Sequence, residues 1–76
     1  MIIKILGTGC PKCKTLETNA RNAVVSSGID ASVEKVTDLK EIMNYGVMMT
    51  PALVIDETVK SAGKVLTSDE IIKFLK

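Results

Sequence analysis

The chain has 76 residues, of which 46% are hydrophobic, and its formal net charge at pH 7 is +1. This length predicts a single domain over residues 1–76, and the 3% aromatic content predicts an aliphatic core. The near-neutral charge and the short apolar runs argue against a nucleic-acid or membrane partner. We also expect no signal peptide and a cytoplasmic location, because the short apolar start runs directly into a cysteine motif.

The first predicted elements are a strand and a long helix. Ile2–Leu6 is a short run rich in β-branched residues, which indicates a buried strand. A helix is predicted to begin at Pro11, since proline is favoured at the first helical position, and to end before Gly28 as the C′ residue. Apolar residues repeat along it at three- and four-residue spacing, at Leu16, Ala20, Ala23 and Val24.

Residues 31–36 predict a second strand. Because a helix joins it to the first strand, the two strands are expected to be parallel with a right-handed crossover. Asp38 and Glu41 have the spacing of a capping box, and they predict a short helix that ends at Gly46.

The last part of the chain predicts a hairpin and a helix. Ala52–Ile55 and residues 58–61 indicate two strands, joined by a tight turn at Asp56-Glu57. Thr67 and Glu70 again have capping-box spacing, so a final helix is expected. The predicted order is βαβαββα, which is typical of an α/β fold.

Cys10-Pro11-Lys12-Cys13 contains the only two cysteines, and the chain has no histidine. The partial positive charge at a helix N-terminus favours a thiolate, and Lys12 and Lys14 add positive potential. We expect Cys10 to be the attacking thiol, because it lies next to the loop. Cys13, one helical turn further in, is expected to be less exposed and to act as the resolving thiol.

Other interpretations of the cysteine pair remain open. A structural disulfide over so short a loop would stabilise the fold by only about 2 kcal/mol on the chain-entropy model, so we disfavour it. A closed zinc site needs four nitrogen or sulfur ligands, but a Cu(I) carrier or an iron–sulfur cluster shared by two chains is possible. A non-catalytic binding module with idle thiols is the third alternative.

The element order, the CxxC after the first strand and Thr50-Pro51 before the third strand together resemble the thioredoxin superfamily. The similarity covers essentially the whole chain, and it is greatest to the small thioredoxin-like and glutaredoxin-like redox-active disulfide proteins of archaea and bacteria. It implies a three-layer α/β fold, βαβαββα, with a four-stranded mixed sheet in the order second–first–third–fourth strand. It also implies a cis peptide bond at Pro51, facing the cysteine pair.

The resemblance implies a dithiol–disulfide oxidoreductase, with Cys10, Cys13 and Pro51 as its catalytic residues. The substrate groove is expected to be formed by Gly9, Pro11, Lys12, Met49 and Thr50. The expected partners are disulfide-containing proteins and a thioredoxin-reductase-like or other dithiol reductant. We expect a monomer that needs no cofactor or metal ion.

The chain departs from the thioredoxin pattern in two places. Gly9 stands where thioredoxins carry a tryptophan, and Lys4 is the only charged residue on the strand where they bury a carboxylate. The Cys-Pro start is glutaredoxin-like, but residues 61–64 do not clearly match the glutathione-binding Gly-Gly segment, so we expect glutathione to be used poorly. Met48 either lines the groove with Met49 or fills the core, and Tyr45 is expected to pack.

Overall fold

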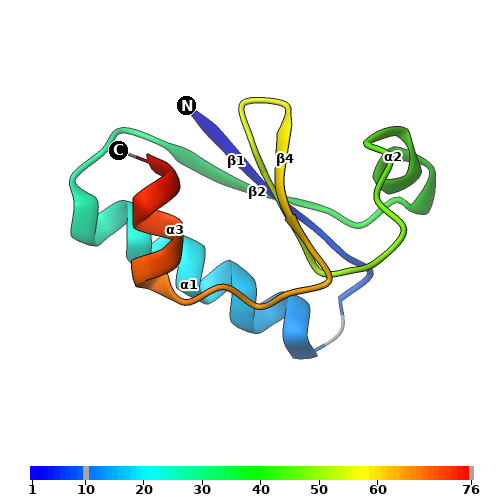
Figure 1. Ribbon diagram of the computed structural model, residues 1–76, viewed down its shortest axis with the longest axis horizontal. Helices are drawn as coiled ribbons and strands as arrows, with labels where there is room; N and C mark the ends of the chain where they lie inside the picture. The colour runs from blue at the N-terminus through cyan, green and yellow to red at the C-terminus, as the bar shows by residue number, and fades with distance from the viewer. Residues whose placement is uncertain (10, 76) are drawn as a thin grey trace.

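The computed structural model describes residues 1–9 and 11–75. Its elements are β1 (Ile2–Leu6), α1 (Pro11–Ser27), β2 (Ser32–Val36), α2 (Leu39–Asn44), β3 (Ala52–Ile55), β4 (Thr58–Ala62) and α3 (Ser68–Leu75). Figure 1 shows them in the predicted order βαβαββα. Two strand boundaries differ by one residue from the predicted ones: β2 begins at Ser32, and β4 ends at Ala62.

The four strands form one mixed sheet in the order β2-β1-β3-β4. β1 pairs with β2 in parallel and with β3 in antiparallel orientation, and β3 and β4 form an antiparallel hairpin. This arrangement confirms the fold class and the strand order that the family resemblance implied.

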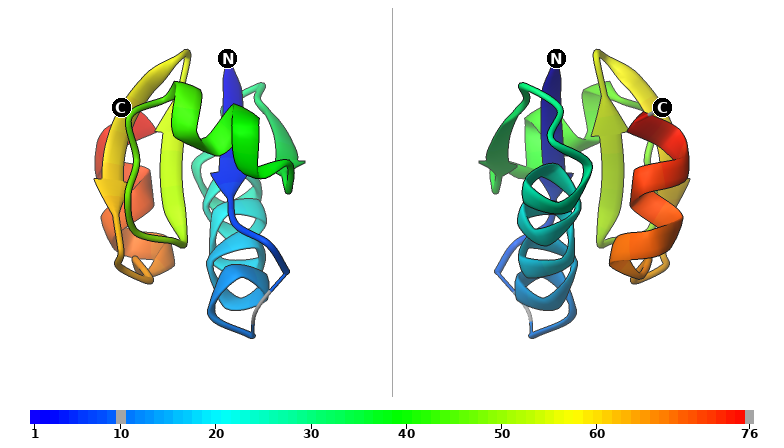
Figure 2. Two further views of the ribbon diagram at one scale, coloured as in Figure 1. Left: turned by 90° about the vertical axis from the view of Figure 1, so that its right-hand side faces the viewer. Right: turned by 90° about the vertical axis from the view of Figure 1, so that its left-hand side faces the viewer.

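Helices cover both faces of the sheet and give the molecule three layers. On one face, α1 and α3 lie side by side (Figure 2) and share a core with Ile3 and Ile5 of β1. On the other face, Ile42 of α2 packs with Leu6 and Val36. Successive residues of a strand point to opposite faces, so one short β-branched strand supplies both cores.

The helix ends follow the predicted signals. Gly28 has φ of +69° and its N–H bonds to the Val24 carbonyl at 3.2 Å, which ends α1 as expected for a C′ glycine. At α3, the Thr67 N–H donates to Glu70 Oε1 and the Glu70 N–H to Thr67 Oγ1, each at 3.2 Å, so this capping box is complete.

At α2, Asp38 is the predicted N-cap, and its carboxylate accepts the Lys40 N–H at 2.9 Å. Glu41, the expected second member of a capping box, instead lines a surface cavity with Lys4 and Tyr45.

The β3–β4 turn is tight because Asp56 and Glu57 both adopt positive φ, at +49° and +67°. Such a conformation is unfavourable for residues with a Cβ, and contacts to β1 stabilise it here. Asp56 Oδ1 accepts the Ile2 N–H at 2.9 Å, and the Asp56 N–H donates to the Ile2 carbonyl at 2.9 Å. These two hydrogen bonds hold the turn against the start of β1. This is the end of the sheet opposite the cysteine motif.

Candidate active site

The cysteine loop and the Thr50-Pro51 segment meet at one end of the sheet. Leu6, the last residue of β1, pairs with Ala52, the first residue of β3. The Gly7 N–H then donates to the Val36 carbonyl at 3.0 Å and extends the ladder between β1 and β2. The loop that leads to the CxxC therefore starts between the ends of two neighbouring strands.

Cys13 lies in the first turn of α1 and is only 6% exposed. Cys13 is therefore largely protected from solvent, and its accessibility relative to Cys10 stays a prediction. Cys10 lies outside the described residues, so its role as the attacking thiol stays a prediction. Gly9, Pro11 and Lys12 are exposed.

Gly7 is a part of the site that the sequence did not single out. A Cβ on Gly7 would overlap Cys13 Sγ and would stand 3.1 Å from Cys13 Cβ. The buried sulfur of Cys13 therefore packs directly against the backbone of the β1–α1 loop. Of the two loop glycines, only Gly9 has a positive φ, which is +97°.

The Thr50–Pro51 peptide bond is cis, the isomer that the family resemblance implied. Pro51 is buried and Thr50 is exposed beside it. The Pro51 carbonyl accepts the Gly63 N–H at 2.8 Å, which fixes this segment to the end of β4.

An apolar groove of about 490 Å³ connects the cysteine loop with the Thr50 segment. Its lining residues are uncharged and come from the loop, α2 and the segment before Pro51: Thr8, Leu39, Ile42, Met43, Gly46, Val47, Met48 and Thr50. Met48 is 94% exposed, so it lines the groove and does not fill the core. Met49, the other methionine expected here, packs against Gly63, where a Cβ would stand 3.1 Å from Met49 Cβ.

The sequence missed the contribution of α2 to this groove. Leu39 and Met43 belong to its apolar face, yet both are exposed, Met43 by 65%, and only Ile42 enters the core. A helix of six residues buries a single side chain here and leaves the flanking apolar residues at the surface. The signal available in the sequence was an apolar helix too short to bury its whole face.

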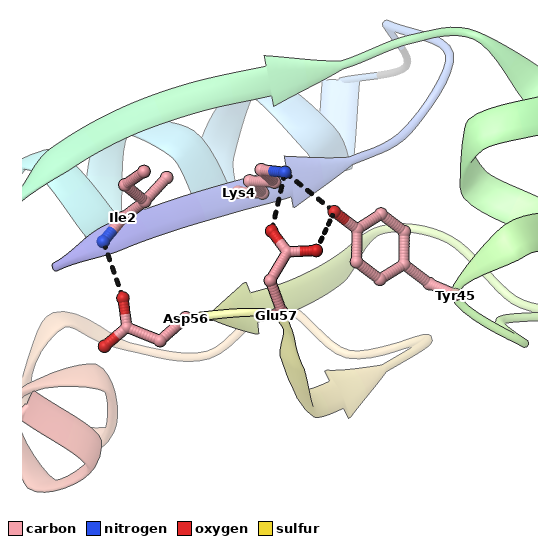
Figure 3. A network of polar contacts seen from close by, with 5 residues as sticks. All are labelled: Ile2, Lys4, Tyr45, Asp56 and Glu57. Atoms are coloured by element: carbon pink, nitrogen blue, oxygen red, sulfur yellow. Dashed lines mark hydrogen bonds and ion pairs between the residues drawn. The ribbon is translucent and has the colours of Figure 1, made fainter.

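Lys4 belongs to a polar network on the α2 face of the sheet (Figure 3). Its Nζ donates to Tyr45 Oη and Glu57 Oε1, each at 2.8 Å, and Tyr45 Oη donates to Glu57 Oε2 at 3.1 Å. The hydrogen bond to Glu57 raises the pKa of Lys4 and lowers the pKa of Glu57. Lys4 therefore stays cationic at neutral pH. Tyr45 packs, as expected, against the core on the α2 face of the sheet, which contains Ile42. It also makes polar contacts that the sequence did not predict.

A second, smaller cavity of about 60 Å³ lies behind Cys13, between α1 and β2. Cys13, Glu17 and Lys35 all line it. Glu17 Oε1 lies 3.3 Å from Lys35 Nζ, and Glu17 Oε2 accepts a hydrogen bond from Arg21 Nη2 at 2.8 Å. The hydrogen bond from Arg21, followed by the one from Lys35, lowers the pKa of Glu17.

Comparison with known proteins agrees with this architecture. The family model of the thioredoxin domain matches residues 1–76. A thioredoxin of Methanothermobacter thermautotrophicus is 44% identical over 75 residues, covering 99% of this chain and 97% of the relative. A thioredoxin of Methanocaldococcus jannaschii is 42% identical over 76 residues, covering 100% of this chain and 87% of the relative.

The mixed sheet between two helical layers is a thioredoxin-like fold, and the relatives indicate a family of thiol–disulfide oxidoreductases. The chain belongs to the thioredoxin family. This membership favours redox chemistry at the cysteine pair over the metal-carrier and idle-module interpretations.

Proposed function

We propose that this protein reduces or exchanges the disulfides of other proteins, with Cys10 and Cys13 as its redox pair. The observation that carries the proposal is the position of Cys13. It is buried in the first turn of α1 against Gly7, and Gly9, Pro11 and Lys12 near it are exposed. This arrangement suits one accessible thiol and one protected thiol that acts second.

The proposed reaction transfers two electrons in two exchange steps. The Cys10 thiolate attacks one sulfur of the substrate disulfide, so a mixed disulfide forms and the other substrate sulfur leaves as a thiolate. Cys13, having lost its proton to solvent, then attacks the Cys10 sulfur. The Cys10–Cys13 bond forms, the second substrate thiolate departs, and both substrate thiolates take protons from water. A dithiol reductant returns the pair to its reduced state.

The groove is the proposed docking surface for the chain that flanks the substrate disulfide. Thr50 is exposed next to Pro51, where its backbone can pair with an extended segment. The uncharged walls favour an apolar side chain in that segment, and the exposed thioethers of Met43 and Met48 adapt to different side-chain shapes. The exposed Gly9, Pro11 and Lys12 are proposed to form the rim nearest the thiols.

The remaining parts of the proposal concern partners and organisation. The reductant is a thioredoxin-reductase-like enzyme or another dithiol donor, and the protein acts as a cytoplasmic monomer. Among the described residues, no helix has the length and apolar character to cross a membrane. The two cores share one sheet, which supports a single domain over residues 1–76.

Insulin reduction with two electron donors tests the function. We expect turnover with dithiothreitol, and slower turnover with glutathione and its reductase, because residues 61–64 do not clearly match the glutaredoxin glutathione-binding segment. Equal or faster turnover with glutathione would assign the protein to the glutaredoxin side. No turnover with either donor would contradict the proposed oxidoreductase function.

Met43→Lys tests the groove. A charge in this uncharged surface is expected to lower kcat/KM for insulin by about tenfold, the effect of removing about 1.4 kcal/mol of binding energy. Reduction of the small disulfide cystine should change little, because cystine does not fill the groove. Val25→Lys is the matched control, since Val25 is an exposed apolar residue near the far end of α1. An equal loss of kcat/KM in both variants would contradict the groove as the docking surface.

A further inference from the structure

We propose that the Glu17–Lys35 ion pair controls the ionisation of Cys13 and so sets the rate of the resolving step. The two residues are positioning residues, because they act on the substrate only through the charge that they present to Cys13. The mechanistic meaning of this inference rests on the proposed function, in which Cys13 attacks the mixed disulfide.

The geometry places the pair and Cys13 around one small cavity. Glu17 follows Cys13 by four residues on α1, so the two side chains lie on the same face of the helix. Lys35 reaches the same place from β2 and contacts Glu17 Oε1 at 3.3 Å. All three residues line the cavity of about 60 Å³, which is large enough to hold a water molecule between the sulfur and the charges.

The charges around Cys13 come from few groups. Lys14 and Glu17 of α1 and Lys35 of β2 line the cavity, whereas β1 contributes the uncharged Ile5. Arg21 contacts Glu17 from the following helical turn. Cys10, which belongs to the same motif, lies outside the described residues. Among the described residues, Glu17 is therefore the one acidic group of the cavity.

Glu17 is held as a carboxylate. Its side chain is only 14% exposed and lies between two cations, and these contacts keep its pKa below the ordinary value. It therefore stays ionised at neutral pH and is a weak base toward the Cys13 thiol. Its influence, like that of Lys35, is the charge that it presents across a small cavity that Cys13 also lines.

Opposite substitutions should therefore have opposite effects. Lys35→Met removes the cation and leaves the Glu17 carboxylate facing Cys13, which disfavours the thiolate and raises the pKa of Cys13. Glu17→Gln removes the anion and leaves Lys14 and Lys35, which lowers the pKa of Cys13. In the complete protein at neutral pH, Lys35→Met should slow the release of substrate from the mixed disulfide, and Glu17→Gln should accelerate it.

The test measures Cys13 ionisation directly in a Cys10→Ser background. The ultraviolet absorbance of the thiolate is followed against pH, and a protein lacking both cysteines serves as the blank. This readout needs no reagent to reach the buried sulfur. We expect shifts of about half a pH unit or more, upward for Lys35→Met and downward for Glu17→Gln.

Lys35→Arg should restore the wild-type midpoint, because it keeps the cation. Glu34→Gln is the matched control, because it makes the same charge change as Glu17→Gln. Glu34 is an exposed neighbour of Lys35 in β2, and the Glu34 side chain points to the other face of the sheet. The proposal would be overturned if the Cys13 midpoint shifted in the same direction in both variants, or in neither. If one variant does not fold, the direction of the shift in the other is sufficient to decide. The measurement needs no turnover. A failure to reduce insulin would therefore contradict the proposed function without affecting the measured effect of the ion pair on Cys13 ionisation.

Discussion

Cys10→Ser is expected to abolish insulin reduction, with turnover falling about a thousandfold or more, as for the loss of a catalytic nucleophile. Cys13→Ser should also stop turnover, but for a different reason. Its Cys10 can attack a substrate disulfide and then has no second thiol to resolve the product. Mass spectrometry should therefore find a stable mixed disulfide with insulin chains in Cys13→Ser and none in Cys10→Ser.

The order of attack has its own measurement. With Cys13→Ser, the alkylation rate of Cys10 should rise with pH around a midpoint below the free-thiol value of about 8.5. The expected causes are the start of α1 and the positive potential of Lys12 and Lys14. A midpoint at or above the free-thiol value, or a mixed disulfide that accumulates on Cys13, would contradict Cys10 as the activated nucleophile.

Gly7→Ala is expected to destabilise the protein by about 1–3 kcal/mol, the usual cost of overpacking, because the new Cβ would overlap Cys13 Sγ. The free energy of unfolding is measured by urea denaturation under reducing conditions. The same substitution in a Cys13→Ala background should cost clearly less, since the sulfur is gone. An equal cost in both backgrounds would show that Gly7 matters for its backbone and not for its contact with Cys13.

The elements of this fold were predictable because their signals are local. The β-branched run of β1, Pro11 at the start of α1 and the capping box of Thr67 and Glu70 each indicate a structure within a few residues. Strand directions followed from the helix between β1 and β2. The sheet order came from the family resemblance, since periodicity does not determine which strands are neighbours.

The details of the site were less predictable because they depend on contacts between distant segments. Gly7 matters because Cys13 packs against it, and Glu17 matters because Lys35 of β2 lies opposite. Met48 lines the groove, whereas Met49 packs against Gly63, whose missing side chain leaves room for it. No local pattern indicates such pairings.

The departure at Lys4 also has a structural explanation. At the strand position where thioredoxins bury a carboxylate, this chain has Lys4, which is hydrogen-bonded to Tyr45 and Glu57. This network lies on the α2 face of the sheet, whereas the cavity behind Cys13 lies between α1 and β2. A carboxylate near Cys13 is thus supplied by α1, through Glu17, and not by β1.

The most direct test of the central claim is a redox titration of the wild-type protein against dithiothreitol buffers, with free thiols counted at each point. We expect two free thiols in the reduced protein and one intramolecular Cys10–Cys13 bridge in the oxidised protein. They should interconvert reversibly in a single two-electron transition, with about 30 mV per tenfold change in the equilibrium constant. Thiols that close only between two chains, or that do not close reversibly at all, would contradict it.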